Sequence, residues 1–142
     1  MGNNGHRAAA GDNGHPRKAP LVLVVDDDPA IRTLCSINLQ SEGFEVLEAS
    51  DGGIGLAQAR LQHPDLVLTD VMMPGLDGFE LASALRRDER TRLIPLIFLS
   101  AQTEPASEAR AHALGALAYV TKPFDPPALS SLVAAALAAT AA

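Results

Sequence analysis

The fold is decided by the stretch LVLVVDDDP at residues 21–29. Five consecutive apolar residues, three of them valine, predict a short strand that is buried on both faces, as in a parallel sheet. The acids Asp26, Asp27 and Asp28 follow at its carboxyl end. Asp28 before Pro29 is the pattern of a helix N-cap and the first helical residue. The stretch therefore predicts a strand, an acidic turn and a helix, which together open a βα unit.

The same alternation of strand and helix continues along the chain. Short apolar runs predict four more strands, at residues 44–49, 65–69, 94–99 and 117–121. Helices are expected after each strand, the third over residues 78–87 and the fourth over residues 104–114. Five βα units with short connections predict an α/β fold, a doubly wound five-stranded parallel sheet with helices on both faces.

Three of the helices show apolar residues at helical spacing, which predicts the face that each one buries. The expected core positions of the first helix are Ile31, Leu34, Cys35 and Leu39, and Gly43 is expected to close it. Those of the second are Ile54, Ala57 and Leu61, and those of the last are Leu129, Leu132, Val133, Ala136 and Leu137. Cys35 is the single cysteine, so a reduced and buried thiol is expected rather than an intrachain disulfide.

Composition limits the possible functions. The net charge of −6 and the pI near 5 argue against a direct nucleic-acid partner, which requires a basic surface. No apolar run reaches the length of about 18 residues that a membrane span requires, and a cleavable secretory leader is not expected. A cytoplasmic location without membrane attachment is the resulting expectation. Residues 1–19 are rich in Gly, Asn and Ala without periodicity, and are expected to form a disordered tail.

Polar and charged side chains stand where the predicted strands end. Asp70 follows residues 66–69, Ser100 follows residues 96–99, and Lys122 precedes Pro123 directly after residues 118–121. In an open α/β sheet, ligands bind in the crevice at the carboxyl ends of the strands, so these side chains are expected to share one crevice with the acids after residue 25.

Asp26, Asp27 and Asp70 are expected to converge there, because Asp28 is used as a helix cap. Three ionised carboxylates repel one another unless a cation neutralises them, and an all-oxygen site suits Mg²⁺, with Mn²⁺ possible. Lys122 could hold an incoming phosphate. The alternatives are that the acids are helix caps or loop residues, that Lys122 forms a structural ion pair, and that Ser100 is a turn residue.

Four segments together resemble a known family. They are VVDDDP at 24–29, LTDVMMPGLDG at 68–78, LSA at 99–101 and YVTKPF at 119–124. These look like the motifs of the response-regulator receiver domain of two-component signalling. The resemblance implies a flavodoxin-like sheet with strand order 2-1-3-4-5 and a receiver domain over residues 20–142.

The resemblance also assigns roles around the acids. It makes Asp70 the phosphoacceptor and a metal ligand together with Asp27, and has Asp26 assist through water. The main-chain carbonyl of Met72 completes the protein's ligands to Mg²⁺. Lys122 would contact the phosphoryl group, and its peptide bond to the following proline is expected to be cis.

A switch is implied as well. By the resemblance Ser100 and Tyr119 are the switch pair, while Met72 and Gln102 flank the path of the attacking water. Signals would leave through the face formed by the helix at 104–114, the strand at 117–121 and the last helix. That face is expected to be rich in alanine and leucine, including Ala113, Leu114, Ala118 and Leu129.

The implied partners are a sensor histidine kinase or phosphotransfer protein upstream and a protein target downstream. The chain would be a signalling domain that assists its own phosphorylation and dephosphorylation, rather than an enzyme.

Three other functions remain open from the sequence. A haloacid-dehalogenase-like phosphatase also uses an aspartyl nucleophile, Mg²⁺, a hydroxyl and a lysine; its motif would place the nucleophile at Asp26, but Ala30 replaces the expected Thr or Val. A flavin-binding electron carrier shares the fold, yet it would need a Ser/Thr/Gly-rich loop where this chain has three acids. A receiver-like scaffold that is never phosphorylated is the third, and the intact Asp27, Asp70, Ser100 and Lys122 argue against it.

Overall fold

The computed structural model describes residues 19–140, which form one five-stranded parallel sheet with helices on both faces. The strands are β1 (Leu21–Val25), β2 (Glu45–Ala49), β3 (Leu66–Asp70), β4 (Leu96–Ser100) and β5 (Ala118–Thr121). The helices are α2 (Pro29–Ser41), α3 (Gly52–Gln62), α4 (Gly78–Arg87), α5 (Pro105–Ala113) and α6 (Pro126–Thr140). The strand order is β2-β1-β3-β4-β5, so the predicted doubly wound sheet and its order are confirmed.

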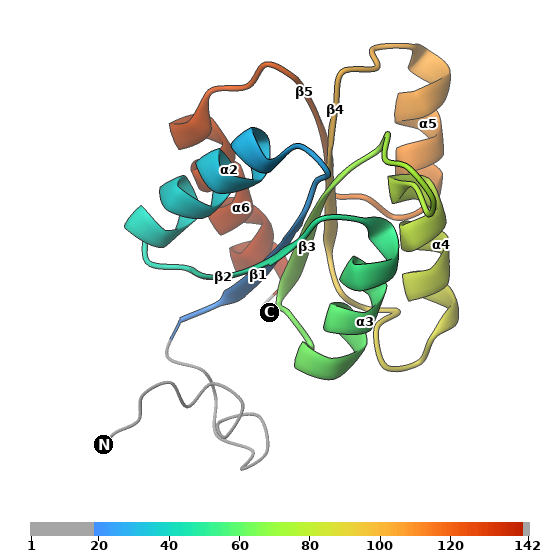
Figure 1. Cartoon of the computed structure of the whole chain (residues 1–142), viewed down its shortest axis with the longest axis horizontal. Helices are drawn as coiled ribbons and strands as arrows, with labels where there is room; N and C mark the ends of the chain where they lie inside the picture. Colours follow the sequence, from blue (N-terminus) through green and yellow to red (C-terminus); the bar gives the residue numbers. More distant parts are fainter. Residues whose placement is uncertain (1–18, 141–142) are drawn as a thin grey trace.

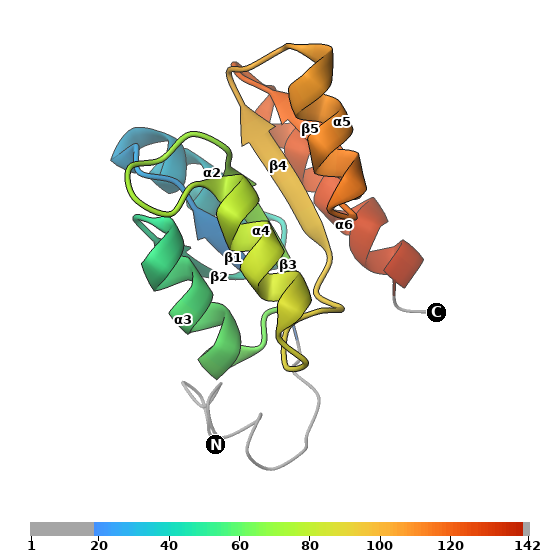
Figure 2. The same cartoon turned by 90° about the vertical axis from the view of Figure 1, so that its right-hand side faces the viewer.

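Helices α2 and α6 cover one face of the sheet, and α3, α4 and α5 cover the other (Figures 1 and 2). Strands β1, β3 and β4 are buried along their whole length, as continuous apolar runs in a parallel sheet should be. On the α2 and α6 side the core includes Cys35, Leu39, Leu68 and Val133. The buried reduced thiol predicted for Cys35 is confirmed, and burial raises the pKa of that thiol to about 12.

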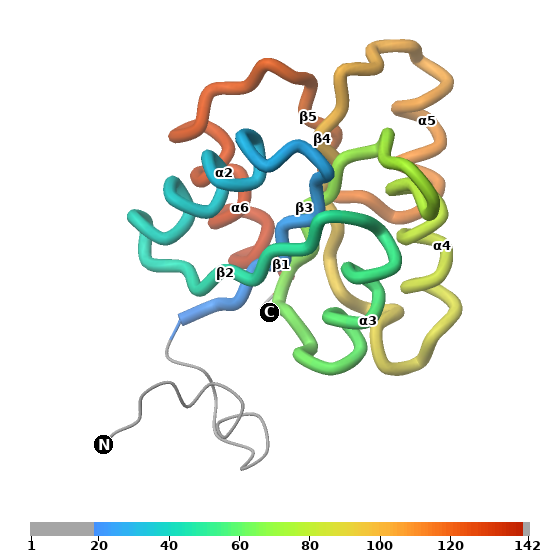
Figure 3. Tube along the Cα trace, viewed as in Figure 1, coloured from blue at the N-terminus to red at the C-terminus, as the bar shows by residue number. Residues whose placement is uncertain are grey.

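The register of the sheet aligns the strand ends that matter for function. Val25 is paired with Thr69, Asp70 with Leu99, and Ser100 with Thr121. Figure 3 shows the chain leaving β1, β3 and β4 along one edge of the sheet. Side chains at these ends are therefore neighbours although they are far apart in sequence.

Local capping chemistry sets where the helices begin and end. Asp28 accepts a hydrogen bond from the Ala30 amide, as expected of the N-cap before Pro29. Asp77 caps α4 in a reciprocal capping box with Glu80. Gly43 has φ of 96°, a left-handed value that favours glycine, and the predicted closure of the first helix there is confirmed.

The predicted buried faces are right for the last helix but wrong for the second. In α3 the expected core residues are all on the outer side, where Ile54 and Leu61 have exposed fractions of 44% and 77% and Ala57 is exposed as well. The residues buried in α3 are Gly52, Gly55 and Ala59. A Cβ on Gly55 would lie 2.9 Å from Val25 Cγ2, so the helix lies too close to β1 for large side chains on that face.

Smaller corrections concern the first helix and the strand ends. Leu34 was expected in the core but has an exposed fraction of 42%, because α2 packs through Cys35, Ser36 and Leu39, which lie about opposite to it on the helix. The fourth strand begins at Leu96 rather than at Ile94, because the Ile94 amide closes a turn by donating to Thr91 O.

Two further expectations concern the ends of the chain and membranes. Most of the tail predicted over residues 1–19 lies in residues 1–18, outside the described residues, so its disorder stays a prediction. Within the described range, none of the helices combines the length and apolar character needed to cross a bilayer.

Candidate functional site

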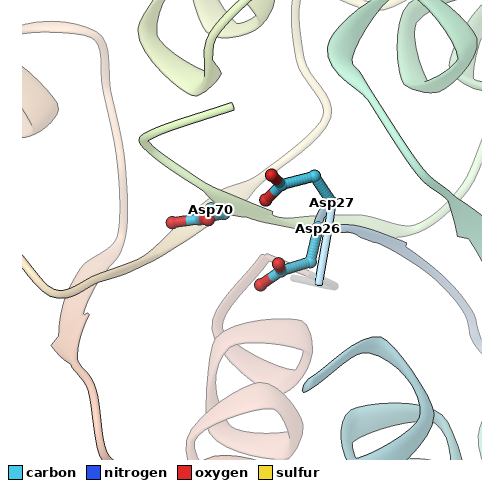
Figure 4. A group of neighbouring side chains, drawn as sticks. All are labelled: Asp26, Asp27 and Asp70. Atoms are coloured by element: carbon cyan, nitrogen blue, oxygen red, sulfur yellow. The ribbon is translucent and has the colours of Figure 1, made fainter. Parts of the chain in front are cut away.

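Three carboxylates meet where β1 and β3 end. Asp26 and Asp27 follow β1, and Asp70 is the last residue of β3. One carboxylate oxygen from each lies within 4.8 Å of the others, and Figure 4 shows the side chains extending into the same space. Asp26 and Asp70 are buried, while Asp27 is exposed. A compact set of hard oxygen donors with one side open to water fits the ligand preference of Mg²⁺.

Lys122 joins two of these acids. Its Nζ lies 3.0 Å from Asp26 Oδ2 and 3.3 Å from Asp70 Oδ2. Burial of Lys122 acts to lower its pKa, but the hydrogen bond and charge of Asp26, together with those of Asp70, outweigh it and raise the pKa. The lysine is therefore a fixed positive charge beside Asp70. Its peptide bond to Pro123 is cis, as expected.

Asp70 is held in an environment that disfavours its charge. Burial raises the pKa of its carboxyl, and the nearby charge of Asp26 raises it further. The charge and hydrogen bond of Lys122 and the backbone hydrogen bond from Met72 act in the opposite direction without cancelling the rise. A cation bound beside Asp70 in addition to Lys122 would stabilise the charged form of the Asp70 carboxylate, which agrees with a metal site next to it.

The backbone of the loop after Asp70 is held by a close glycine contact. Gly78 donates its amide to Val71 O at 2.8 Å. A Cβ on Gly78 would lie 2.1 Å from Asp70 O and 2.9 Å from Val71 Cα, so only glycine fits without displacing the backbone of the acceptor residue.

Gly78→Ala is expected to destabilise the protein by about 1–3 kcal/mol, because the added methyl group forces β3 and α4 apart. Urea unfolding of the purified variant measures this. Gly53→Ala is the matched control. Gly53 is exposed within α3, and its added Cβ would meet only Asp51 Oδ1, at 3.4 Å. The control should gain up to about 1 kcal/mol. Equal stability of Gly78→Ala and the wild-type chain would mean that the contact with Asp70 is not tight.

Ser100 and Tyr119 are connected through Gln102. The Gln102 amide donates to Ser100 Oγ at 2.9 Å, and the Tyr119 hydroxyl donates to the Gln102 carbonyl at 2.8 Å. The Ser107 hydroxyl, on α5, donates to Gln102 Oε1 at 3.0 Å. Sequence reasoning placed Gln102 beside the water path but missed these contacts. Two of the three use its main chain, which leaves no signal in residue identity.

The structure thus brings Asp26, Asp27, Asp70 and Lys122 together and places Ser100 at the adjoining strand end. The backbone of Met72 acts to lower the pKa of Asp70; the role of the Met72 carbonyl as a metal ligand stays a prediction. An acidic crevice with a lysine and a hydroxyl therefore lies at the carboxyl ends of a doubly wound sheet, which is where sheets of this kind bind their ligands.

Comparisons with known proteins identify the family of this chain. The response regulator receiver domain family matches residues 22–134. The chain is 38% identical over 117 residues to protein PilH of Pseudomonas aeruginosa, a match covering 82% of this chain and 97% of PilH. It is 46% identical over 106 residues to the DNA-binding dual master transcriptional regulator RpaA of Synechocystis, covering 75% of this chain but 44% of RpaA. The chain thus spans less than half the length of that regulator.

Solved structures of receiver domains have the same fold as this chain. Chemotaxis protein CheY4 of Vibrio cholerae superposes with a TM-score of 0.79 at 35% identity, covering 83% of this chain and 98% of CheY4. A CheY-like receiver domain protein from Methanospirillum hungatei gives a TM-score of 0.82 at 27% identity, covering 87% of this chain and 98% of that one. The chain belongs to the response regulator receiver domain family.

Proposed function

We propose that the chain is the phosphoacceptor of a two-component phosphorelay, with Asp70 receiving a phosphoryl group from a phosphohistidine. The donor would be a sensor histidine kinase or a phosphotransfer protein. The observation that carries the proposal is the position of Lys122, whose ammonium contacts Asp70 at 3.3 Å beside the cluster of three carboxylates.

The proposed step is a nucleophilic displacement at phosphorus. An oxygen of Asp70 attacks in line, the P–N bond of the phosphohistidine breaks, and an acyl phosphate forms while the imidazole leaves. Lys122 offsets the charge of the transferring group from a fixed position. Asp27, Asp70 and the Met72 carbonyl would hold Mg²⁺, with Asp26 assisting through water, and the ion when bound supplies further neutralising charge. Hydrolysis of the acyl phosphate later returns the free carboxylate.

Incubation with a small phosphodonor such as acetyl phosphate tests the proposal. In the presence of Mg²⁺ the intact mass should rise by one phosphoryl group, and EDTA should abolish the gain. Asp27→Ala should require a higher Mg²⁺ concentration for the same labelling, because it removes the exposed ligand. The variant should keep or gain metal-free stability, since it relieves repulsion. Labelling that is indifferent to EDTA would contradict a metal-assisted site.

Phosphorylation of Asp70 is proposed to act on the rest of the domain through the hydrogen bonds of Gln102. A phosphoryl group on Asp70 would offer Ser100 a new acceptor and draw its hydroxyl away from the Gln102 amide. The main chain of Gln102 is also the acceptor for Tyr119, so the Tyr119 ring would be released to turn. Phosphorylation changes the balance between two conformations of Tyr119 only to the extent that it stabilises one of them more than the other.

Ser100→Ala is expected to blunt this response while leaving Asp70 reactive. With the phosphoryl mimic beryllofluoride and Mg²⁺, amide NMR shifts of residues 104–121 should change in the wild-type chain and change less in the variant. Acetyl phosphate labelling serves as the control for an intact acceptor. A full set of shifts in Ser100→Ala would overturn the coupling.

The output face is proposed to be formed by α5, β5 and α6, with one correction to its predicted composition. Ala113 is exposed and Leu114 and Ala118 are half-buried, whereas Leu129 has an exposed fraction of 3% and belongs to the core under α6. A downstream protein would therefore meet alanines and Tyr119 rather than Leu129.

We place this signalling in the cytoplasm, without direct contact to nucleic acid or membrane.

The phosphatase alternative assigns the nucleophile to Asp26. Both oxygens of that residue are already engaged, Oδ1 by the Asp28 amide at 2.9 Å and Oδ2 by Lys122 at 3.0 Å. Asp26 is also fully buried. Asp70 therefore has the stronger claim to be the nucleophile.

A further inference from the structure

A shallow pocket is lined by residues from the last turns of α3 and α4 and from the loop that follows α4. These helix ends lie at the edge of the molecule opposite the carboxyl ends of the strands (Figure 2). The volume of the pocket is about 490 Å³. The lining residues are Arg60, Ala84, Arg87, Asp88, Glu89 and Arg90. Helices of a βα unit run back against the strands, so this pocket is remote from Asp70 and has no part in the proposed phosphoryl transfer.

The pocket lies in a basic region of an acidic protein. The chain has a net charge of −6 and 11 lysines and arginines. Three of these cations line the pocket: Arg60 on the last turn of α3, Arg87 on the last turn of α4, and Arg90 on the loop that follows α4. The nearest acids in sequence are Asp88 and Glu89. Such a local excess of positive charge attracts anionic partners.

The loop that follows α4 is fixed rather than free. Arg86 donates to three main-chain carbonyls, those of Leu114, Arg92 and Ile94, at 2.8–3.0 Å. The buried Thr91 hydroxyl donates to Leu85 O at 2.8 Å. These bonds set the shape of the loop, so the arginines beside it project from a rigid base.

Asp88 orients two of the pocket arginines. Its Oδ2 accepts from Arg60 Nε and from Arg90 Nη2, both at 2.9 Å. The arginines hold the pKa of Asp88 well below its usual range, first through the hydrogen bonds of Arg90 and then through Arg60. Their side chains keep exposed fractions of 38% and 60%. Arg87 is exposed and makes no ion pair with any residue of the described range 19–140. Two held guanidinium groups and a third without an ion pair therefore face the same opening.

We propose that this pocket docks an acidic segment of a partner protein through Asp or Glu side chains. Guanidinium groups bind carboxylates in a two-point fork, which suits a peptide that presents several carboxylates. Small-molecule sites are enclosed and mostly apolar, whereas this pocket is shallow and Ala84 is its one apolar lining residue. A protein segment therefore fits better than a small anion. Because the pocket is far from Asp70, docking does not require phosphorylation.

Fluorescence anisotropy with fluorescein-labelled octaglutamate tests the proposal on the full chain. Arg87→Gln/Arg90→Gln should weaken binding about five- to tenfold, as expected for two exposed charge pairs. Arg110→Gln is the control, because it removes one exposed charge on α5, where Arg110 lies over the Phe79 ring at 4.5 Å. The control should bind within about twofold of the wild-type chain, and circular dichroism verifies the fold of each variant.

NMR shifts on adding the peptide should centre on Ala84 and residues 87–90. Absence of binding, or equal weakening by Arg110→Gln, would overturn the proposal. Binding of pyrophosphate at these residues without binding of the peptide would also overturn it, in favour of a small anion. Asp70→Asn should bind the peptide like the wild-type chain, so failure here is separate from failure of the proposed function.

Discussion

The Asp70→Asn protein is expected to gain no phosphoryl mass under conditions that label the wild-type chain. The amide cannot form an acyl phosphate, and we propose that Asp70 is the only acceptor. The effect should be a complete loss, because the two neighbouring acids cannot substitute. Asp26 is buried with both oxygens engaged, and Asp27 lies after β1 rather than at the end of β3 beside Lys122.

The same variant should be more stable than the wild-type chain in the absence of metal. Burial and the charge of Asp26 raise the pKa of Asp70 in the folded protein above its ordinary value of 3.8. A carboxyl whose pKa is raised by folding costs stability once the pH passes its unfolded pKa, so an uncharged side chain removes that cost at pH 7. Urea unfolding in EDTA measures the gain.

Asp125→Asn provides the matched control, since Asp125 is exposed just beyond β5. It should be labelled like the wild-type chain. Full labelling of Asp70→Asn would place the acceptor elsewhere, and a loss of metal-free stability would mean that the Asp70 carboxylate is a structural partner of Lys122.

Lys122→Met is expected to slow labelling by about 10²-fold, the usual effect of removing one preorganised group that stabilises transition-state charge. It should also destabilise the fold by about 2–3 kcal/mol at pH 7, because the buried Asp26 loses its ion-pair partner. The rate of mass gain and urea unfolding measure the two effects.

The pH dependence of the free energy of unfolding reports the contribution of Lys122 separately from the contributions of the aspartates around it. Burial lowers the pKa of Lys122, but Asp26 and Asp70 raise it above 10.5 in the folded protein. A raised lysine pKa contributes stability that is fully present below the unfolded pKa and is lost as the pH rises through the folded pKa. The wild-type chain should therefore lose stability above about pH 10.5, and Lys122→Met should lack that component. Parallel curves for the two proteins would contradict the ion pair.

The sequence predicted the sheet and the crevice well because both follow from local patterns. Buried apolar runs end in Asp26, Asp70 and Ser100. A parallel sheet brings the carboxyl ends of its strands to one edge, and this does not depend on the conformation of the loops. Strand order and residue roles came from the family resemblance.

The helix faces and the smaller contacts were beyond sequence reasoning. In α3 the core side is set by the close approach of Gly55 to Val25, so the apolar residues that suggested the opposite face point outward. Gln102 connects Ser100 and Tyr119 largely through its main chain, which any residue could supply. The arginines of the basic pocket come from two helices and a loop, and only the fold shows that Arg60 meets Asp88.

The most direct test of the account is to map which aspartate carries the phosphoryl group. After labelling with acetyl phosphate and Mg²⁺, reduction of the acyl phosphate with borohydride converts the modified aspartate to homoserine, which peptide mass spectrometry can locate. The account predicts homoserine at Asp70 and unmodified residues at Asp26 and Asp27. Homoserine at Asp26 would contradict it and would favour the phosphatase alternative.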